Sequence, residues 1–147
     1  MAAHPNLVDS PSAVRDILTQ SRTIAVLGIK TEAQADQAAF YVPKYMQAAG
    51  YDIIPVPVYY PEVTEILGRK AYRKLVDIPG PVDLVNVFRR PKDVPGHVAD
   101  ILAKKPRAVW LQLGIRNDEA ALKLAEAGIE VVQDRCIMVD HRALRAR

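Results

Sequence analysis

The sequence has little of what disulfide, zinc and membrane proteins depend on. It contains one cysteine, Cys136, so no disulfide can form within the chain. No CxxC motif or His/Cys cluster has the spacing of zinc ligands, which argues against a metal site. The apolar runs are short, and none approaches the roughly 20 residues that cross a bilayer. Because Met1 to Gln20 also lacks a signal-peptide core, we expect a cytoplasmic protein that does not bind membranes.

The chain also has little excess of one sign of charge. The net charge is +3, and the basic residues are spread over several stretches without an aromatic-rich basic motif, so nucleic acid is not an expected partner. Half of the 147 residues are apolar, which is typical of a folded globular protein. We predict a single domain over 1–147, with 1–9 and 143–147 as tails. The composition leaves open whether the chain forms oligomers.

Apolar runs alternate with amphipathic segments along the chain. Near-continuous apolar runs are typical of strands that are buried on both faces of a parallel sheet. The alternation therefore predicts a doubly wound, Rossmann-like α/β fold with about five parallel strands and helices on both faces. The expected strands are 23–28, 52–56, 82–88, 108–113 and 129–132, and the expected helices begin after Ser10, near residues 40–42, at Lys92 and after Asn117.

Ligands of open parallel sheets bind beyond the carboxyl ends of the strands, so the residues that follow each strand are the candidate site. Gly28 lets a phosphate approach the backbone of the first loop. Pro43 is tolerated only in a first helical turn, which places the helix start near Val42 and its free amides beside Gly28. The alternatives without a ligand are a tight turn at Gly28 and a helix kinked by Pro43.

A dinucleotide site is disfavoured by two absences. The G-x-G-x-x-G fingerprint is missing, because Lys30 and Ala33 stand where its later glycines belong. Pro57-Val58 follows the second strand, where an NAD-binding domain usually carries an acidic residue for the ribose. NADP binding would have to depend on Arg69 or Lys70, and it stays open as an alternative.

Arginine and lysine follow two of the strands. Arg89 and Arg90 stand between an apolar strand and Pro91, where a guanidinium can pair with phosphate. Lys30 in the first loop strengthens this anion hypothesis. The alternative is that the arginines are solvated or paired within the protein.

Cys136 follows the last strand and is either a reactive thiol or a small buried apolar group. A Cys-His hydrolase would need His97 or His141 as the partner, and the sequence places neither near the thiol. The chain also lacks the G-x-S-x-G motif of serine hydrolases.

Several short motifs occur together in a characteristic order. The chain carries Gly28, Tyr51-x-Ile53-Ile54-Pro55-Val56, Leu67-Gly68, Asp77-Ile78-Pro79, Val82-Asp83, Phe88-Arg89, Val109-Trp110-Leu111-Gln112-Leu113-Gly114 and Asp134-Arg135-Cys136. This order resembles the small stand-alone CoA-binding domain proteins, which are similar to the nucleotide-binding domain of the succinyl-CoA synthetase α subunit. The resemblance covers roughly residues 15 to 142.

The resemblance implies a Rossmann-like fold with CoA or acyl-CoA as the cofactor. The implied ligand contacts, together with those from strand ends, are Gly28, Ile29, Lys30, Val42, Pro57, Val58, Phe88, Arg89, Arg90, Gln112, Leu113, Gly114 and Cys136. These 147 residues show no ATP-binding domain, so we do not expect a complete acyl-CoA ligase. We therefore expect a non-catalytic CoA or acyl-CoA sensor or carrier. An acyl-CoA-dependent or thiol enzyme that uses Cys136 is the alternative, ahead of an NADP-binding module.

Overall fold

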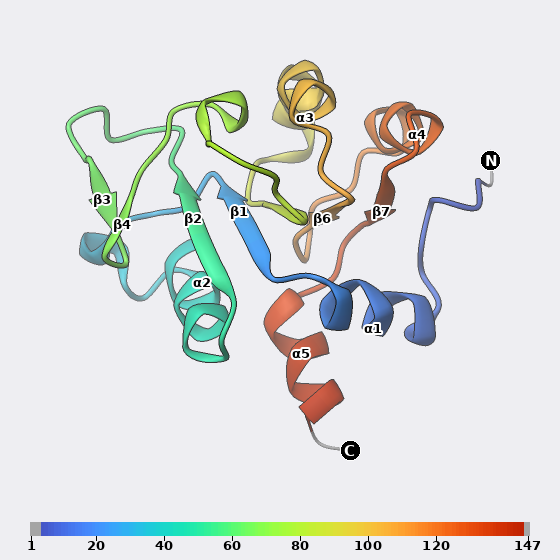
Figure 1. Cartoon of the computed structure of the whole chain (residues 1–147), viewed down its shortest axis with the longest axis horizontal. Coiled ribbons are helices and arrows are strands. Elements are labelled where there is room, and N and C mark those ends of the chain that lie inside the picture. Colours follow the sequence, from blue (N-terminus) through green and yellow to red (C-terminus); the bar gives the residue numbers. More distant parts are fainter. Residues whose placement is uncertain (1–3, 146–147) are drawn as a thin grey trace.

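A five-stranded parallel sheet forms the centre of the molecule. The computed structural model describes residues 4–145 and orders the strands β2-β1-β5-β6-β7 (Figure 1). This arrangement confirms the predicted Rossmann-like α/β fold, including its five parallel strands. The strands are β1 (Thr23–Leu27), β2 (Asp52–Val56), β5 (Leu84–Val87), β6 (Ala108–Leu111) and β7 (Glu130–Val132).

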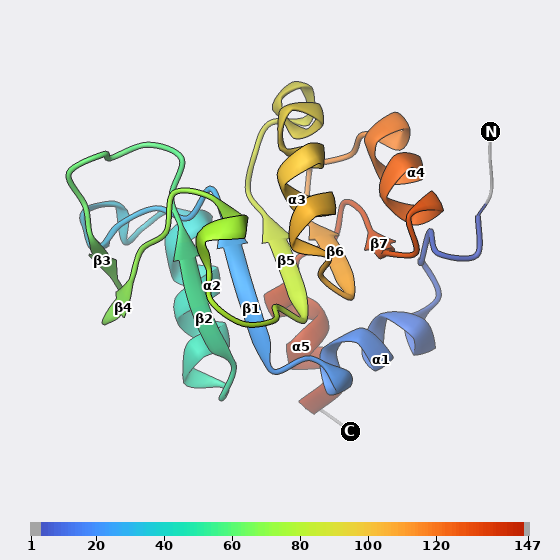
Figure 2. The same cartoon turned by 45° about the horizontal axis from the view of Figure 1, so that its top comes forward.

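Helices cover both faces of the sheet, and each face has its own apolar core. Figures 1 and 2 show α1, α2 and α5 on one face and α3 and α4 on the other. Successive strand residues point to opposite faces, so Trp110 belongs to the first core and Leu111 to the second. Both are fully buried, which explains the continuous apolar runs. The helices are α1 (Pro11–Gln20), α2 (Ala38–Ala48), α3 (Val98–Lys104), α4 (Asp118–Glu126) and α5 (Ile137–Arg145).

Two helices begin where the sequence predicted, directly after Ser10 and directly after Asn117. Ser10 caps α1, and its Oγ accepts from the Ala13 amide at 3.3 Å. Pro11 is the first helical residue. Asn117 caps α4 in the same way, and its Oδ1 accepts from the Ala120 amide at 3.0 Å. These side chains satisfy amides that no helical carbonyl reaches, which fixes where each helix begins.

The order in which strands are added to the sheet reverses between β1 and β5. The chain leaves these two neighbouring strands toward opposite faces of the sheet. After β1 it continues to α2 on one face, and after β5 it continues to α3 on the other. Gly28 lies directly after β1 with φ +88°, where a Cβ would stand 2.3 Å from the carbonyl oxygen of Phe88. The two loops therefore meet backbone to backbone before they diverge, and ligands of such sheets bind at this kind of position.

The start of α2 differs from the prediction. The helix begins at Ala38 rather than near residues 40–42, and Pro43 lies inside it. Proline has no N–H for the carbonyl four residues earlier, which belongs to Ala39. The backbone N–H of Lys30 donates to that carbonyl at 3.1 Å. Pro43 therefore leaves the Ala39 carbonyl free, and the hydrogen bond from Lys30 joins the loop after β1 to the first turn of α2. The sequence pattern did not indicate this tertiary contact.

The helix expected at Lys92 begins as a 3₁₀-helix over Pro91–His97 and becomes α3 only at Val98. The helix α5 and a hairpin were not predicted. A short antiparallel hairpin of β3 (Glu65–Ile66) and β4 (Arg69–Lys70) lies beyond β2 (Figure 1). The helix α5 includes 143–145 of the expected C-terminal tail, and Leu7, in the expected N-terminal tail, forms a parallel bridge with Val131. Residues 1–3 and 146–147 of these tails lie outside the described residues. Between residues 4 and 145, no helix is both long and apolar enough to cross a membrane.

We expect Gly28→Ala to destabilise the fold by about 2–3 kcal/mol, because the new Cβ meets a backbone carbonyl that cannot move and the residue keeps a positive φ. Urea denaturation measures the change. Gly68→Ala is the matched control, since Gly68 also has a positive φ but nothing lies within 4 Å of the point that its Cβ would occupy. The Gly68→Ala variant should lose only about 1 kcal/mol of unfolding free energy, from backbone strain. Equal losses for both variants would show that the close approach to Phe88 is unimportant.

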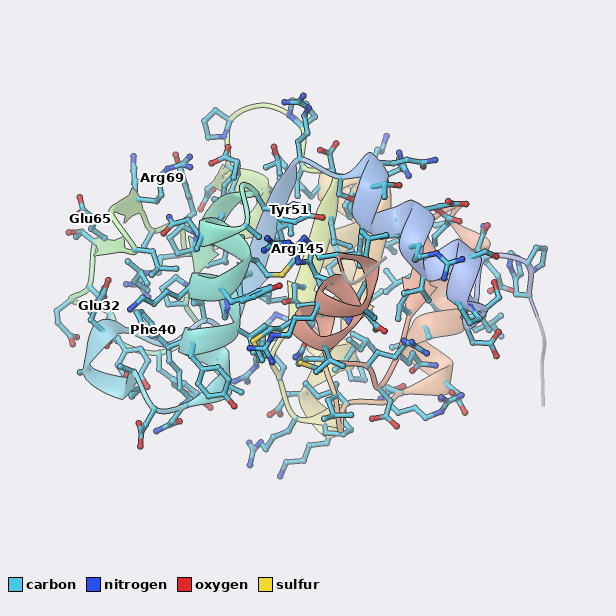
Figure 3. All side chains as sticks on the ribbon, turned by 90° about the horizontal axis from the view of Figure 1, so that it is seen from below. Glu32, Phe40, Tyr51, Glu65, Arg69 and Arg145 are labelled. Atoms are coloured by element: carbon cyan, nitrogen blue, oxygen red, sulfur yellow. The ribbon has the colours of Figure 1, made fainter. Side chains whose placement is uncertain are left out.

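A buried histidine joins α5 to α2. His141 is 6% exposed, and its Nδ1 lies 2.9 Å from the hydroxyl of Tyr45. Its ring also packs edge-on against Tyr51, which is labelled in Figure 3. Burial, and then the positive charge of Arg145, lower the pKa of His141 below its ordinary value of 6.5. The imidazole is therefore neutral in the folded protein near pH 7, and Tyr45 donates to it.

The unfolded chain binds a proton at His141 more readily than the folded chain does. We therefore expect the free energy of unfolding to be level above about pH 7 and to fall as the pH drops through 6.5. Chemical denaturation between pH 5 and about 8 measures this slope. His141→Gln should flatten it. Burial also lowers the pKa of His97, so His97→Gln is measured in parallel. An unchanged slope in His141→Gln would contradict the assignment to His141.

Candidate functional site

A cavity of about 480 Å³ opens at the carboxyl edge of the sheet, on the face covered by α2 and α5. Figure 3 views the molecule from this face, with Phe40 marking the first turns of α2. Three loops contribute to the cavity, namely those after β5, β6 and β7, together with the beginning of α2. The lining residues are Ala38, Ala39, Tyr41, Val42, Phe88, Arg89, Arg90, Pro91, Gln112, Leu113, Gly114, Ile115, Cys136 and Met138.

The cavity brings together many of the residues that were predicted from strand ends. Those that line it are Val42, Phe88, Arg89, Arg90, Gln112, Leu113, Gly114 and Cys136. The first loop and the turn after β2 do not line it: Gly28, Ile29, Lys30, Pro57 and Val58. Ile29 is 1% exposed and belongs to the core. Gly28 and the Lys30 amide instead shape the cavity indirectly, through their contacts with Phe88 and α2.

One end of the cavity is suited to an anion. Ala38 and Ala39 begin α2, and their backbone amides have no hydrogen-bond partner among the described residues. The positive end of the helix dipole therefore faces this part of the lining. The Arg90 side chain, which is 64% exposed, also lines the cavity and donates to Asp93 at 2.9 Å. A phosphate could accept from the free amides and from Arg90 together.

Arg89 is held in place by its neighbours. Its Nε donates to Nε2 of His97 at 3.2 Å, and its guanidinium lies 3.5 Å from Asp93. Burial, and then the charge of Arg89, lower the pKa of His97, which keeps this imidazole neutral and able to accept. The guanidinium also lies 5.3 Å from the ring centre of Tyr59, whose phenol pKa it lowers. Arg89 is thus a partly buried cation with a fixed direction.

The motifs after β6 and β7 form one hydrogen-bonded network. Trp110 Nε1 donates to the carbonyl of Arg135 at 2.8 Å. Asp134, at φ +57°, accepts from the Gly114 amide at 2.6 Å. Arg135 in turn pairs with Asp140 through two hydrogen bonds of 2.8 and 2.6 Å. These contacts tie the two loops together and give the Trp110-to-Gly114 and Asp134-to-Cys136 motifs a structural role.

Gln112 connects this network to the cavity. It is 4% exposed, and its Oε1 accepts from Asn86 Nδ2 and from the Ile137 amide, each at 3.3 Å. The Ile137 amide is the first of α5, so the Gln112 side chain satisfies one free end of that helix. Cys136 stands immediately before α5, is half-buried, and lines the cavity.

Sequence reasoning missed the aromatic loop after β2. Tyr59, which is 55% exposed, reaches across the crevice to Arg89. Arg73 holds this loop, because its guanidinium donates to the carbonyls of Tyr59, Tyr60 and Val63 at 2.6–3.0 Å. The run Val58-Tyr59-Tyr60 of exposed apolar and aromatic residues was the available signal, but nothing local linked it to Arg73 or Arg89.

The two residues on which NADP binding would depend, Arg69 and Lys70, lie away from the cavity. Arg69 forms an ion pair with Asp52, the first residue of β2, and this pair is at the amino edge of the sheet. Lys70 lies over the ring of Tyr72, 5.3 Å from its centre. Neither side chain lines the cavity, so the cations needed for a 2′-phosphate are not at the proposed site.

A second cavity, of about 500 Å³, lies at the β7 edge between the N-terminal segment and α4. Asp9, Asp118 and Glu119 line it, with Arg116 paired to Asp118 at 3.1 Å. The surplus of carboxylates would repel phosphates. In the part of the chain that the structure describes, no group of three or more His, Cys, Asp or Glu residues is arranged to hold a metal ion. The cavity between α2 and α5 is therefore the better site for an anionic ligand.

Comparisons with known proteins identify one family model and similar chains. A family model described as a CoA binding domain matches residues 22–142. An uncharacterized protein, YneT, of Bacillus subtilis is 42% identical over 132 residues, which cover 90% of this chain and 94% of that protein. A solved structure from Thermus thermophilus has 41% identity and a TM-score of 0.84, and covers 92% of this chain and 99% of its own.

The fold also occurs within larger enzymes. The dinucleotide-forming acetyl-coenzyme A synthetase 1 of Candidatus Korarchaeum cryptofilum, in its apo form, has a TM-score of 0.61 with 17% identity. The match covers 79% of this chain and 27% of that one. At this identity the likeness concerns the fold alone.

Proposed function

The chain belongs to the CoA binding domain family, and on that premise we propose that it binds CoA or acyl-CoA in the cavity between α2 and α5 as a non-catalytic sensor or carrier. The observation that carries the proposal is the division of the cavity into two unlike ends. The free amides of α2 and Arg90 belong to the side of β1 and β5, whereas Gln112 and Cys136 follow β6 and β7, where most of the other lining residues are apolar. CoA has the same division, with phosphates at one end and a thiol on an uncharged arm at the other.

This division sets the direction of the ligand. The pyrophosphate lies against the first amides of α2 with Arg89 and Arg90, where helix dipole and cations favour negative charge. The uncharged arm extends between Val42 and Leu113 toward the start of α5, where most of the lining is apolar. The adenosine then lies on the other side of the arginines, near the loop of Tyr59.

Ligand binding tests the proposal directly. Isothermal titration calorimetry with CoA, acetyl-CoA, NADP and ATP should show binding of CoA or acetyl-CoA in preference to the other two. The absence of CoA and acetyl-CoA binding at millimolar ligand would end the proposal. Tighter binding of NADP than of CoA would return the site to the dinucleotide class, against the position of Arg69.

We expect Arg89→Ala to weaken CoA binding by about 1.5–3 kcal/mol, the range for a hydrogen bond to a charged group. Calorimetry measures the affinity, and denaturation checks that the loss of the Arg89–His97 bond has not unfolded the variant. Arg90→Ala tests the same end of the cavity with an exposed side chain. Arg69→Ala is the control, because its partner Asp52 lies at the opposite edge. Equal CoA affinities in all three variants would place the phosphates elsewhere.

A second candidate, an acyl-CoA-dependent thiol enzyme, is favoured by the position of Cys136 in the cavity lining. The step would be transfer of the acyl group between two thiols. A bond forms between the acyl carbon and Cys136 Sγ, the bond to the CoA sulfur breaks, and the Cys136 proton passes to that sulfur.

Intact-mass measurement after incubation with acetyl-CoA distinguishes the two candidates. The enzyme candidate predicts one added acetyl group that is absent in Cys136→Ser. The carrier or sensor predicts reversible binding with an unchanged protein mass. We expect the second result, because no histidine hydrogen-bonds with Cys136 among the described residues. A hydroxylamine-sensitive acetyl adduct on Cys136 would overturn that expectation.

A further inference from the structure

One polar group in the cavity has no partner. Gln112 is only 4% exposed, and its Oε1 accepts two hydrogen bonds, whereas its Nε2 donates none to the described residues. Both partners of Oε1, Asn86 Nδ2 and the Ile137 amide, can only donate, so the amide cannot be turned end for end. The orientation of the free N–H₂ group is therefore fixed by the protein.

The free group faces the cavity. Between residues 4 and 145, no fully enclosed side-chain nitrogen or oxygen lacks a hydrogen-bond partner. An unpartnered Nε2 must therefore reach an open surface, and Gln112 lines the cavity between α2 and α5. Cys136 and Met138, at the start of α5, line the cavity with it. Gln112 Nε2 is thus a hydrogen-bond donor in mostly apolar surroundings. Leaving such a donor without an acceptor costs free energy.

We infer that Gln112 Nε2 binds the thioester carbonyl oxygen of an acyl-CoA, so that the site selects acyl-CoA over ligands that lack this carbonyl. The inference rests on the proposed function and on its ligand direction. An ionised phosphate fits the exposed Arg90 end and not a nearly buried, uncharged donor. The uncharged arm of the ligand offers carbonyl oxygens, and the thioester carbonyl is the last of these, at the end of the arm that reaches α5.

The neighbours of Gln112 suit the acyl group. Leu113 is 65% exposed and Met138 is half-buried, and both line the cavity beside Gln112. Their apolar surfaces would cover a short alkyl group bonded to the thioester carbon. The backbone amides of Met138 and Val139, in the first turn of α5, also have no partner among the described residues, which makes this end of the cavity favourable for a carbonyl dipole. We therefore assign a short-chain acyl thioester as the ligand class.

The test compares acetyl-CoA with S-ethyl-CoA, a thioether of nearly the same size that has no carbonyl. The wild-type protein should bind acetyl-CoA roughly 2- to 10-fold more tightly, as expected for one hydrogen bond. Gln112→Glu keeps an oxygen for Asn86 and Ile137 but replaces the free N–H₂. In this variant the preference should disappear or reverse. Gln34→Glu is the control, because it makes the same change outside the cavity lining and keeps an oxygen for the Thr31 amide, so it should keep the preference.

The outcomes separate this inference from the proposed function. Equal wild-type affinities for acetyl-CoA and S-ethyl-CoA would overturn the carbonyl assignment and leave CoA binding intact. An unchanged preference for acetyl-CoA over S-ethyl-CoA in a folded Gln112→Glu variant would also overturn it. Failure of all three ligands to bind the wild-type protein would defeat the proposed function itself. The wild-type comparison decides the matter even if Gln112→Glu does not fold.

Discussion

The backbone contact between Gly28 and Phe88 is the constraint on which the cavity depends. At this point two neighbouring parallel strands send the chain to opposite faces of the sheet, and a Cβ on residue 28 would stand 2.3 Å from a carbonyl oxygen. The loop after β1 must then pass to α2 at once, and the Lys30 amide fastens it to Ala39. The first turn of α2 thereby lies beside the loop that carries Arg89 and Arg90, with its amides available to a ligand.

The opposite end of the cavity is fixed by polar groups rather than by close packing. Trp110 and Asp134 tie the loop after β6 to the loop after β7, and Gln112 joins both to the start of α5. A buried network of this kind loses free energy at every member that lacks a partner. Here the network leaves one donor, Gln112 Nε2, facing the cavity. The same contacts that hold the loops together thus determine where a carbonyl oxygen is favoured.

The sequence predicted the sheet well because buried parallel strands and capped helices leave local patterns. The apolar run before Gly28 and the caps Ser10 and Asn117 each follow from a few neighbouring residues. The start of α2 was misplaced because a local rule for Pro43 could not foresee that the Lys30 amide takes the carbonyl of Ala39. The hairpin β3–β4 was missed because its strands are two residues each, too short to show a period.

The order of apolar runs, glycines and caps by itself determined a parallel α/β sheet, because side-chain periodicity and turn chemistry act over a few residues, and it predicted a ligand site at the strand ends. Only the tertiary structure decided which strand-end residues line one cavity. It separated Arg90, exposed at the mouth, from Arg69, paired at the far edge, and it left Gln112 with one free donor. Hydrogen-bond partners distant in the sequence make these distinctions, and no local pattern records them.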